Sequence, residues 1–259
     1  MTVLRNSMPL KAYYFGLVAL LYLPLAILFL FSLNSSTFLS FPLQGFTLDW
    51  YRKLFASDAL LRSARNSLVV ALGSSLTATL MGTMVGLLTM RYQFRSKGLL
   101  VAMAVLPLIV PYIVLAVALL LLFSVLNIDR SLWTVGAAHT VVALPYVLLI
   151  VASRLAGFDA NLEEAAMDLG ATYPTTLRRV VIPMIAPAMV SAWLTAFTVS
   201  FDEFALALFL AGTQPTFPVY LYGQLRFANR LPIMIALAVL MMIGTLTLVL
   251  IAERVRRAE

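Results

Sequence analysis

The sequence predicts an all-α integral membrane protein with six transmembrane helices. Of its 259 residues, 62% are apolar and only 11% are charged, whereas a soluble domain carries about 25% charged residues. So few charges would not cover a water-soluble protein of this size, but a bilayer accepts an apolar exterior. The Lys and Arg residues lie in short segments between long apolar runs, which is typical of membrane topology.

Six apolar runs are long enough to cross a bilayer, because a spanning helix needs roughly 20 residues. We expect one domain over residues 1–259, with spans at residues 12–33, 63–90, 99–126, 132–153, 184–211 and 231–252. The first run is longer than the apolar core of a signal peptide, about 7–15 residues, and no A-x-A cleavage site follows it. We therefore expect it to be retained as a helix.

Two spans carry features that predict how they pack. Small residues recur at every fourth position of the second span and predict a close approach to a neighbouring helix; they are Ser74, Ala78, Gly82 and Gly86. The third span contains Pro107 and Pro111, which predict kinks supported by neighbouring helices.

The distribution of basic residues predicts that both termini lie in the cytoplasm. In this orientation, 11 of the 18 Lys and Arg residues lie in inner segments and 7 in outer ones, the bias expected of cytoplasmic loops. The polar stretch 34–61 is then an external loop. Trp50 and Tyr51 predict a short helix there at the membrane interface, the depth that aromatic residues favour.

Several kinds of chemistry are absent from the sequence. It has no cysteine, a single histidine, His139, and no G-x-x-x-x-G-K-[ST] phosphate loop, so disulfides, histidine metal clusters and the usual ATP site are excluded. A serine paired with His139 would suggest an intramembrane hydrolase, but no particular serine is tied to it. We favour a histidine that is hydrogen-bonded between helices.

The polar segment 154–183, between the fourth and fifth spans, is the most informative part of the chain. Acidic residues at its start suit a helix N-terminus, and Gly170 suits a helix end. Pro174 suits the first turn of a second helix, and Pro183 marks the entry to the next span. The pattern predicts two short helices joined at Gly170 at the cytoplasmic face.

The spacing within this segment resembles the EAA loop of permease subunits in binding-protein-dependent ABC importers. The positions that match are Glu164, Ala165, Ala166, Gly170, Val180 and Pro183, with Ile182 where leucine is usual. The six-span layout extends the resemblance over nearly the whole chain. The runs at 44–51 and 200–204 look like the branch that serves polyamines such as spermidine and putrescine, opines and related solutes.

The resemblance implies that this loop is a coupling element that docks on an ATP-binding subunit. Ala165 and Ala166 would permit close docking, Glu164 would supply a polar contact, and Gly170 would make the bend. It also implies a place in a bacterial inner membrane, two ATP-binding subunits that hold ATP and Mg²⁺, a second permease subunit and a periplasmic or tethered binding protein. The chain itself would be no enzyme, would bind no cofactor or nucleic acid, and would contact lipid. A homodimer stays open as an alternative to a heterodimer.

Asp202 and Glu203 are the acids of the fifth span, and intramembrane acids usually face the bundle interior or a water-filled path. At about 100° per residue, Thr195, Thr198 and Asp202 share one stripe, whereas an aromatic stripe that includes Trp193 lies opposite. We expect the polar stripe to line the substrate path and Asp202 to meet a cationic solute, with Glu203 on its flank. The alternative is that both acids are interhelical hydrogen-bond partners.

Three other functions remain open. An opine or amino-acid-like solute would keep the importer but change its cargo. An ion-coupled secondary transporter would need charges on several helices and broken helices at the midplane. A structural subunit would have no path of its own.

Overall fold

A computed structural model of the chain describes residues 8–157, 159 and 161–258. The regular structure of these residues is helical, apart from an isolated antiparallel bridge between Asn34 and Phe46. The chain divides into a terminal unit, residues 1–61 and 221–259, and a central unit, residues 62–220.

The terminal unit contains the first and last long helices, α1 (Met8–Ser32) and α12 (Leu231–Ala258), with the short α2 (Asp49–Phe55) and a 3-10 turn, Ala228–Arg230. Helix α12 packs against both α1 and α2. Trp50 in α2 is 7% exposed, and its indole N–H donates a hydrogen bond to the Asn34 carbonyl at 2.7 Å. The sequence predicted an interfacial helix near Trp50; the helix is there, but this side chain is buried within the protein because its N–H has a backbone partner.

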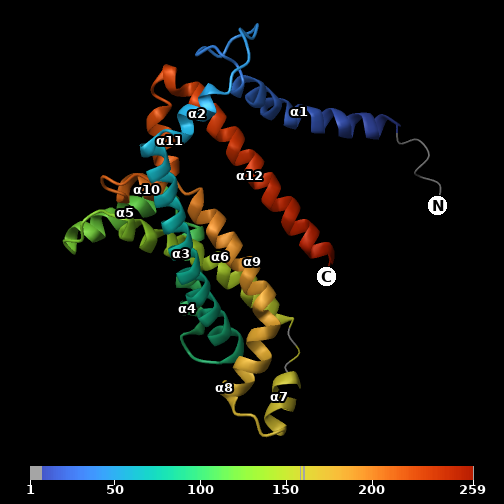
Figure 1. Cartoon of the computed structure of the whole chain (residues 1–259). Coiled ribbons are helices and arrows are strands. Elements are labelled where there is room, and N and C mark those ends of the chain that lie inside the picture. The colour runs from blue at the N-terminus through green and yellow to red at the C-terminus, as the bar shows by residue number, and fades with distance from the viewer. Residues whose placement is uncertain (1–7, 158, 160, 259) are drawn as a thin grey trace. The chain divides into compact units, whose positions relative to one another are not determined.

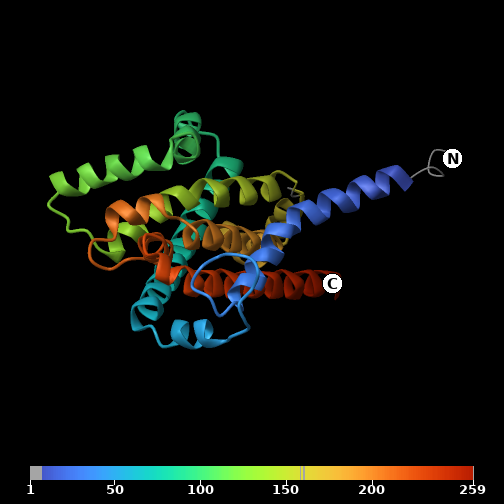
Figure 2. The same ribbon diagram turned by 90° about the horizontal axis from the view of Figure 1, so that it is seen from above.

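The central unit follows with a long helix and a bent pair. Helix α3 (Asp58–Arg91) covers the second predicted span. The third predicted span is α4 (Lys97–Val105), a 3-10 turn (Leu106–Leu108) and α5 (Tyr112–Val125), bent by 109° (Figure 2). The prediction of one kinked helix is thus wrong: Pro107 sits in the 3-10 turn, and Pro111 has the extended ψ of 132° that precedes a new helix.

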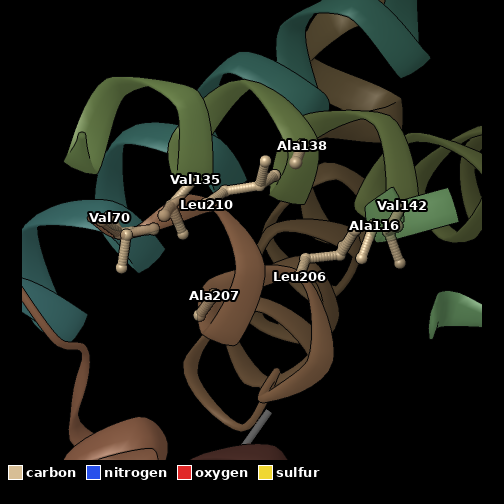
Figure 3. Close-up of a cluster of buried hydrophobic side chains, with 9 residues drawn as sticks. Val70, Ala116, Val135, Ala138, Val142, Leu206, Ala207 and Leu210 are labelled. Atoms are coloured by element: carbon tan, nitrogen blue, oxygen red, sulfur yellow. The ribbon is translucent and has the colours of Figure 1, made fainter. Parts of the chain in front are cut away.

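The rest of the central unit is built on two long helices that run side by side, α6 (Leu132–Ala156) and α9 (Ile182–Phe201) (Figure 1). Between them come α7 (Asn161–Asp168), α8 (Tyr173–Thr176) and a π-helical turn, Leu177–Val181; after α9 come α10 (Ala205–Leu210) and α11 (Phe217–Gln224). Helix α10 packs against α5 and α6. Figure 3 shows the resulting apolar cluster, in which Leu206 and Leu210 of α10 meet Val135 and Val142 of α6.

Close packing of α3 on α6 confirms the small-residue pattern. A Cβ atom on Gly82 would lie 2.7 Å from Val147 Cγ1, and one on Gly86 would lie 3.4 Å from Val151 Cγ1. Ala78 is fully buried. These small residues therefore allow the valines of α6 to reach the backbone of α3.

Four described helices are long and apolar enough to cross a membrane, and the bent pair α4–α5 makes a fifth candidate. The sixth predicted span coincides with α12, whose described apolar stretch is the shorter Ala228–Gly244. The all-α membrane fold is confirmed, whereas the count of six spans stays a prediction.

Candidate functional site

The fifth predicted span, residues 184–211, is interrupted at its two acids. Helix α9 ends at Phe201, residues 202–204 are outside any helix, and α10 begins at Ala205. The cause is local: the Glu203 carboxylate accepts the N–H groups of Leu206 and Ala207 at 2.9–3.2 Å. A side chain that satisfies these first N–H groups starts a new helix and competes with continuation of the old one. The continuous span predicted from hydropathy is therefore wrong here.

Asp202 lies at the rim of an open pocket formed by this interruption. Its side chain is exposed, and its backbone N–H still bonds to the Thr198 carbonyl at 3.1 Å as the last turn of α9. The pocket has a volume of about 420 Å³ and is lined by Tyr112, Tyr146, Val199, Asp202, Glu203, Phe204 and Ala205. A carboxylate beside aromatic rings is a combination that binds amines and other cations.

The predicted polar stripe leads along α9 to this pocket. Thr195 is half-buried and Thr198 is exposed. Both hydroxyls donate to carbonyls of their own helix at 2.9 Å, Thr195 to Ser191 and Thr198 to Leu194. Their oxygens therefore remain available as acceptors on the face that carries Asp202.

The predicted aromatic stripe of α9 is confirmed over its helical part. The rings of Trp193 and Phe197 have centroids 6.4 Å apart, and those of Phe197 and Phe201 are stacked at 5.8 Å. Phe201 then stacks on Phe217 of α11 at 6.3 Å. One face of α9 is thus fixed by ring packing, which leaves the Thr195–Asp202 face for another use.

Glu203 points into the protein rather than along the stripe. It is 6% exposed, and its Oε2 atom lies 3.3 Å from His139 Nε2. The other ring nitrogen, His139 Nδ1, is 2.7 Å from the Ser200 hydroxyl. His139 thus joins α6 to α9 by a hydrogen bond, as the sequence analysis favoured. The sequence alone did not tell which serine lies beside His139, and the structure identifies it as Ser200.

The polar segment after α6 folds as predicted around Gly170. Helix α7 ends in a turn in which Gly170 has a φ of +86° and the Ala171 N–H bonds to the Ala166 carbonyl at 3.1 Å. This six-to-one bond with a left-handed glycine is the Schellman helix end. Glycine suits the position because other residues pay about 1–2 kcal/mol for a left-handed backbone.

The surface of α7 fits a docking element. Glu164 and Ala165 are exposed and Ala166 is half-buried, so the matching positions of the EAA pattern are accessible. Leu169 is 90% exposed, although it lies in a polar segment outside the predicted spans.

An ion pair that the sequence did not predict connects α7 to the end of α3. The guanidinium of Arg91, at the end of α3, forms an ion pair with Glu163, which is 8% exposed. Next to it, the rings of Tyr92 and Tyr173 meet edge to face at 6.2 Å. The sequence carried part of the signal, because Arg91 begins a basic stretch, residues 91–97, and Glu163 lies in the acidic start of the segment 154–183.

The sequence predicted that Pro183 marks a boundary between a short second helix and the fifth span. The structure has no helix boundary at this proline. The helical segment that begins at Tyr173 continues to Phe201. The chain passes Pro183 because the preceding turn, Leu177–Val181, is π-helical. A wider turn accommodates the proline ring and the carbonyl that loses its N–H partner. Arg178 and Arg179 are therefore inside a long helix rather than at the end of a short one.

Comparison with known protein families assigns the chain to a family of transport proteins. The family described as "Binding-protein-dependent transport system inner membrane component" matches residues 58–258. The chain belongs to this family, and it is a permease of a binding-protein-dependent ABC importer.

Among its relatives are permeases named for polyamine transport. The chain is 35% identical to the spermidine/putrescine transport system permease protein PotC of Haemophilus influenzae, over 95% of this chain and 96% of that protein. It is 36% identical to PotC of Escherichia coli, over 93% and 91% of the two chains. The putrescine transport system permease protein PotI of Escherichia coli is 33% identical, over 80% and 76%.

Solved structures confirm the fold. A bacterial ABC transporter involved in the import of the acidic polysaccharide alginate aligns with a TM-score of 0.74 at 17% identity, over 96% of this chain and 97% of that chain. The alginate transporter in complex with its periplasmic protein aligns at 0.71, over 95% and 92%.

Proposed function

We propose that this chain forms part of the translocation path for a cationic polyamine such as spermidine or putrescine. Asp202 carries the proposal, as an exposed carboxylate at an interrupted apolar helix beside the rings of Tyr112, Tyr146 and Phe204. The names of the relatives support the same solute class.

The interruption explains how an acid serves in this position. A carboxylate on an apolar span is costly unless it faces water or a partner. At the end of α9, Asp202 faces an open pocket, where a passing ammonium group meets a charge that is screened less than at the protein surface. Thr195 and Thr198 extend this face with hydroxyl acceptors. Glu203 contributes negative charge to the pocket wall while its oxygens hold α10.

Replacement of Asp202 tests this proposal. Asp202→Asn keeps the shape but removes the charge, so we expect spermidine uptake to fall about tenfold, the loss of one charge-assisted hydrogen bond. ATP hydrolysis by the assembled complex should persist. Uptake is measured in reconstituted vesicles and normalised to assembled complex.

Asp129→Asn is the matched control, because Asp129 is an exposed acid that does not line the Asp202 pocket. It should transport normally. Normal uptake by Asp202→Asn would remove this residue from the path, and with it the main argument for a cationic solute.

We further propose that α7 is the coupling helix. Glu164, Ala165, Ala166 and the exposed Leu169 would dock on one of two ATP-binding subunits, which hold ATP and Mg²⁺ and hydrolyse the nucleotide. Gly170 would set the angle of the docking surface, and Pro183 would belong to the π-bulged start of α9. A second permease and a soluble or tethered binding protein would complete the importer, with both termini of this chain in the cytoplasm.

Gly170→Pro tests the coupling helix. Proline fixes φ near −65°, whereas Gly170 has a φ of +86°, so the turn after α7 would be lost. We expect uptake and solute-stimulated ATP hydrolysis to be abolished while the chain still inserts into the membrane. Gly157→Ala, at a nearby glycine with a φ of −89°, should retain both. Full transport by Gly170→Pro would refute the assignment of the loop.

A further inference from the structure

A chain of buried polar groups connects three long helices next to the interruption. The hydroxyls of Ser74 in α3 and Ser200 in α9 are 2.8 Å apart, Ser200 is 2.7 Å from Nδ1 of His139 in α6, and the opposite ring nitrogen faces Glu203. The four side chains, of Ser74, Ser200, His139 and Glu203, are each between 2% and 6% exposed.

One tautomer of His139 satisfies the contacts of both ring nitrogens. A neutral imidazole with its proton on Nε2 turns an N–H toward the Glu203 carboxylate and leaves Nδ1 to accept from Ser200. Ser200 can in turn accept from Ser74. At 3.3 Å the contact between His139 and Glu203 is mainly electrostatic, because it lies beyond the usual N–H···O distance.

Glu203 needs such a partner because its charge is buried. An ion withdrawn from water costs several kcal/mol unless hydrogen bonds and opposite charge replace its hydration. The N–H groups of Leu206 and Ala207 supply hydrogen bonds of this kind, and the edge of the His139 ring lies beside the same carboxylate. The same contacts fix the backbone at Glu203, whose chain neighbour is Asp202.

We propose that His139 and Ser200 are positioning residues that act through Glu203: they hold the interruption at residues 202–204 in one conformation and so direct Asp202 into its pocket. The proposal rests on the proposed function of Asp202 for its effect on transport. Its structural part stands independently of the solute, because it concerns only the conformation of residues 202–204.

The absence of cysteine from the sequence permits a test that needs no transport. A nitroxide on the thiol of Asp202→Cys, the only cysteine of this chain, should give an electron paramagnetic resonance spectrum with one ordered component in a full complex whose other subunits carry no reactive cysteine. Adding His139→Leu should introduce a second, mobile component. Ser200→Ala removes one hydroxyl and should act in the same direction, which keeps the test decisive if His139→Leu fails to assemble.

Thr134→Val is the matched control. Thr134 is 4% exposed, and its hydroxyl also links α6 to α10 through the Leu210 carbonyl at 3.0 Å, at the far end of α10 from Asp202. It should leave the spectrum unchanged even if it lowers the melting temperature. An unchanged spectrum in both the His139→Leu and Ser200→Ala proteins, with or without a loss of thermal stability, would overturn the proposal.

Uptake separates this inference from the proposed function. With Asp202 present, His139→Leu should lower spermidine uptake by about as much as Asp202→Asn, and the double variant should lower it no further. If Asp202→Asn transports normally while the spectra change as expected, the path assignment fails and the positioning role stands. If uptake falls for Asp202→Asn alone and the spectra stay unchanged, the path assignment stands and the positioning role fails.

Discussion

Asp202 and Glu203 are adjacent in the chain, yet their side chains have opposite environments. Asp202 is exposed at the end of α9, whereas Glu203 is buried and accepts the first N–H groups of α10. Two like charges next to each other in an apolar segment are tolerable here because one faces the open pocket, whereas the other accepts backbone N–H groups and lies beside the ring edge of His139. The two carboxylates should therefore respond differently to loss of charge.

We expect Glu203→Gln to lower the stability of the complex and Asp202→Asn to leave it nearly unchanged. Hydrogen bonds to a charged, buried acceptor contribute roughly 1.5–3 kcal/mol, and the amide that replaces the Glu203 carboxylate would keep only one acceptor oxygen. The measurement is the thermal unfolding midpoint of the purified complex for both proteins. Equal midpoints would mean that Glu203 does not hold the interruption.

At the scale of elements, glycine placement sets the contact between α3 and α6. Gly82 meets Val147 where a methyl group would be too close, whereas a Cβ atom at Gly73, nine residues earlier in α3, would meet nothing within 4 Å. The two positions have the same residue in the same helix but different neighbours. They form a natural pair for measuring what close packing contributes.

Gly82→Ala should destabilise the chain by about 1–3 kcal/mol, the usual cost of overpacking. Gly73→Ala should be neutral or stabilise by up to about 1 kcal/mol, because alanine is the better helix former. Thermal unfolding of the two variants in the same detergent is the measurement. A Gly82→Ala protein as stable as Gly73→Ala would contradict the close α3–α6 contact.

A second contact between elements is the ion pair that links α3 and α7. Because Arg91 pairs with Glu163, the proposed coupling helix is attached to α3 as well as to the segments that flank it. We expect Glu163→Arg to lower the ratio of solute imported to ATP hydrolysed, and we expect the charge exchange Arg91→Glu/Glu163→Arg to restore it in part. Glu164→Arg, at the exposed neighbour, should not be rescued by Arg91→Glu. Equal ratios in the Glu163→Arg and exchanged proteins would argue against the link.

At the scale of the whole molecule, the orientation in the membrane is a prediction from the basic residues, and the absence of cysteine from the sequence makes it measurable. Cysteines introduced by Ala56→Cys and Gln214→Cys should react with an impermeant thiol reagent added outside intact cells. Those from Ser96→Cys and Thr172→Cys should react only after the membrane is opened. All four positions are exposed. Reaction of Thr172→Cys from outside would exclude a cytoplasmic coupling loop.

The sequence by itself determined the class of fold and the local shape of the proposed coupling element. Apolar runs of the right length require a bilayer, and the positions of Gly82 and Gly170 follow from local rules on backbone approach and helix ends. The spacing of small residues and the glycine at a helix end are patterns within one helix or one turn, so they can be recognised in the sequence before the packing partner is known. The stripe of Thr195, Thr198 and Asp202 on α9 is likewise a matter of helical period.

Hydropathy did not predict where helices stop, and only the tertiary structure decided which distant polar groups meet. Hydropathy treats residues 184–211 as one apolar run, because it does not register that the Glu203 carboxylate can satisfy the N–H groups of a new helix. Pro183 looks like a boundary until the π turn before it accommodates the ring. The contacts of His139 with Ser200 and Glu203, and of Arg91 with Glu163, join residues 61, 64 and 72 positions apart. Such pairs depend on how the helices pack, because hydrogen bonds and ion pairs require proximity in space and leave no periodic signal along the chain.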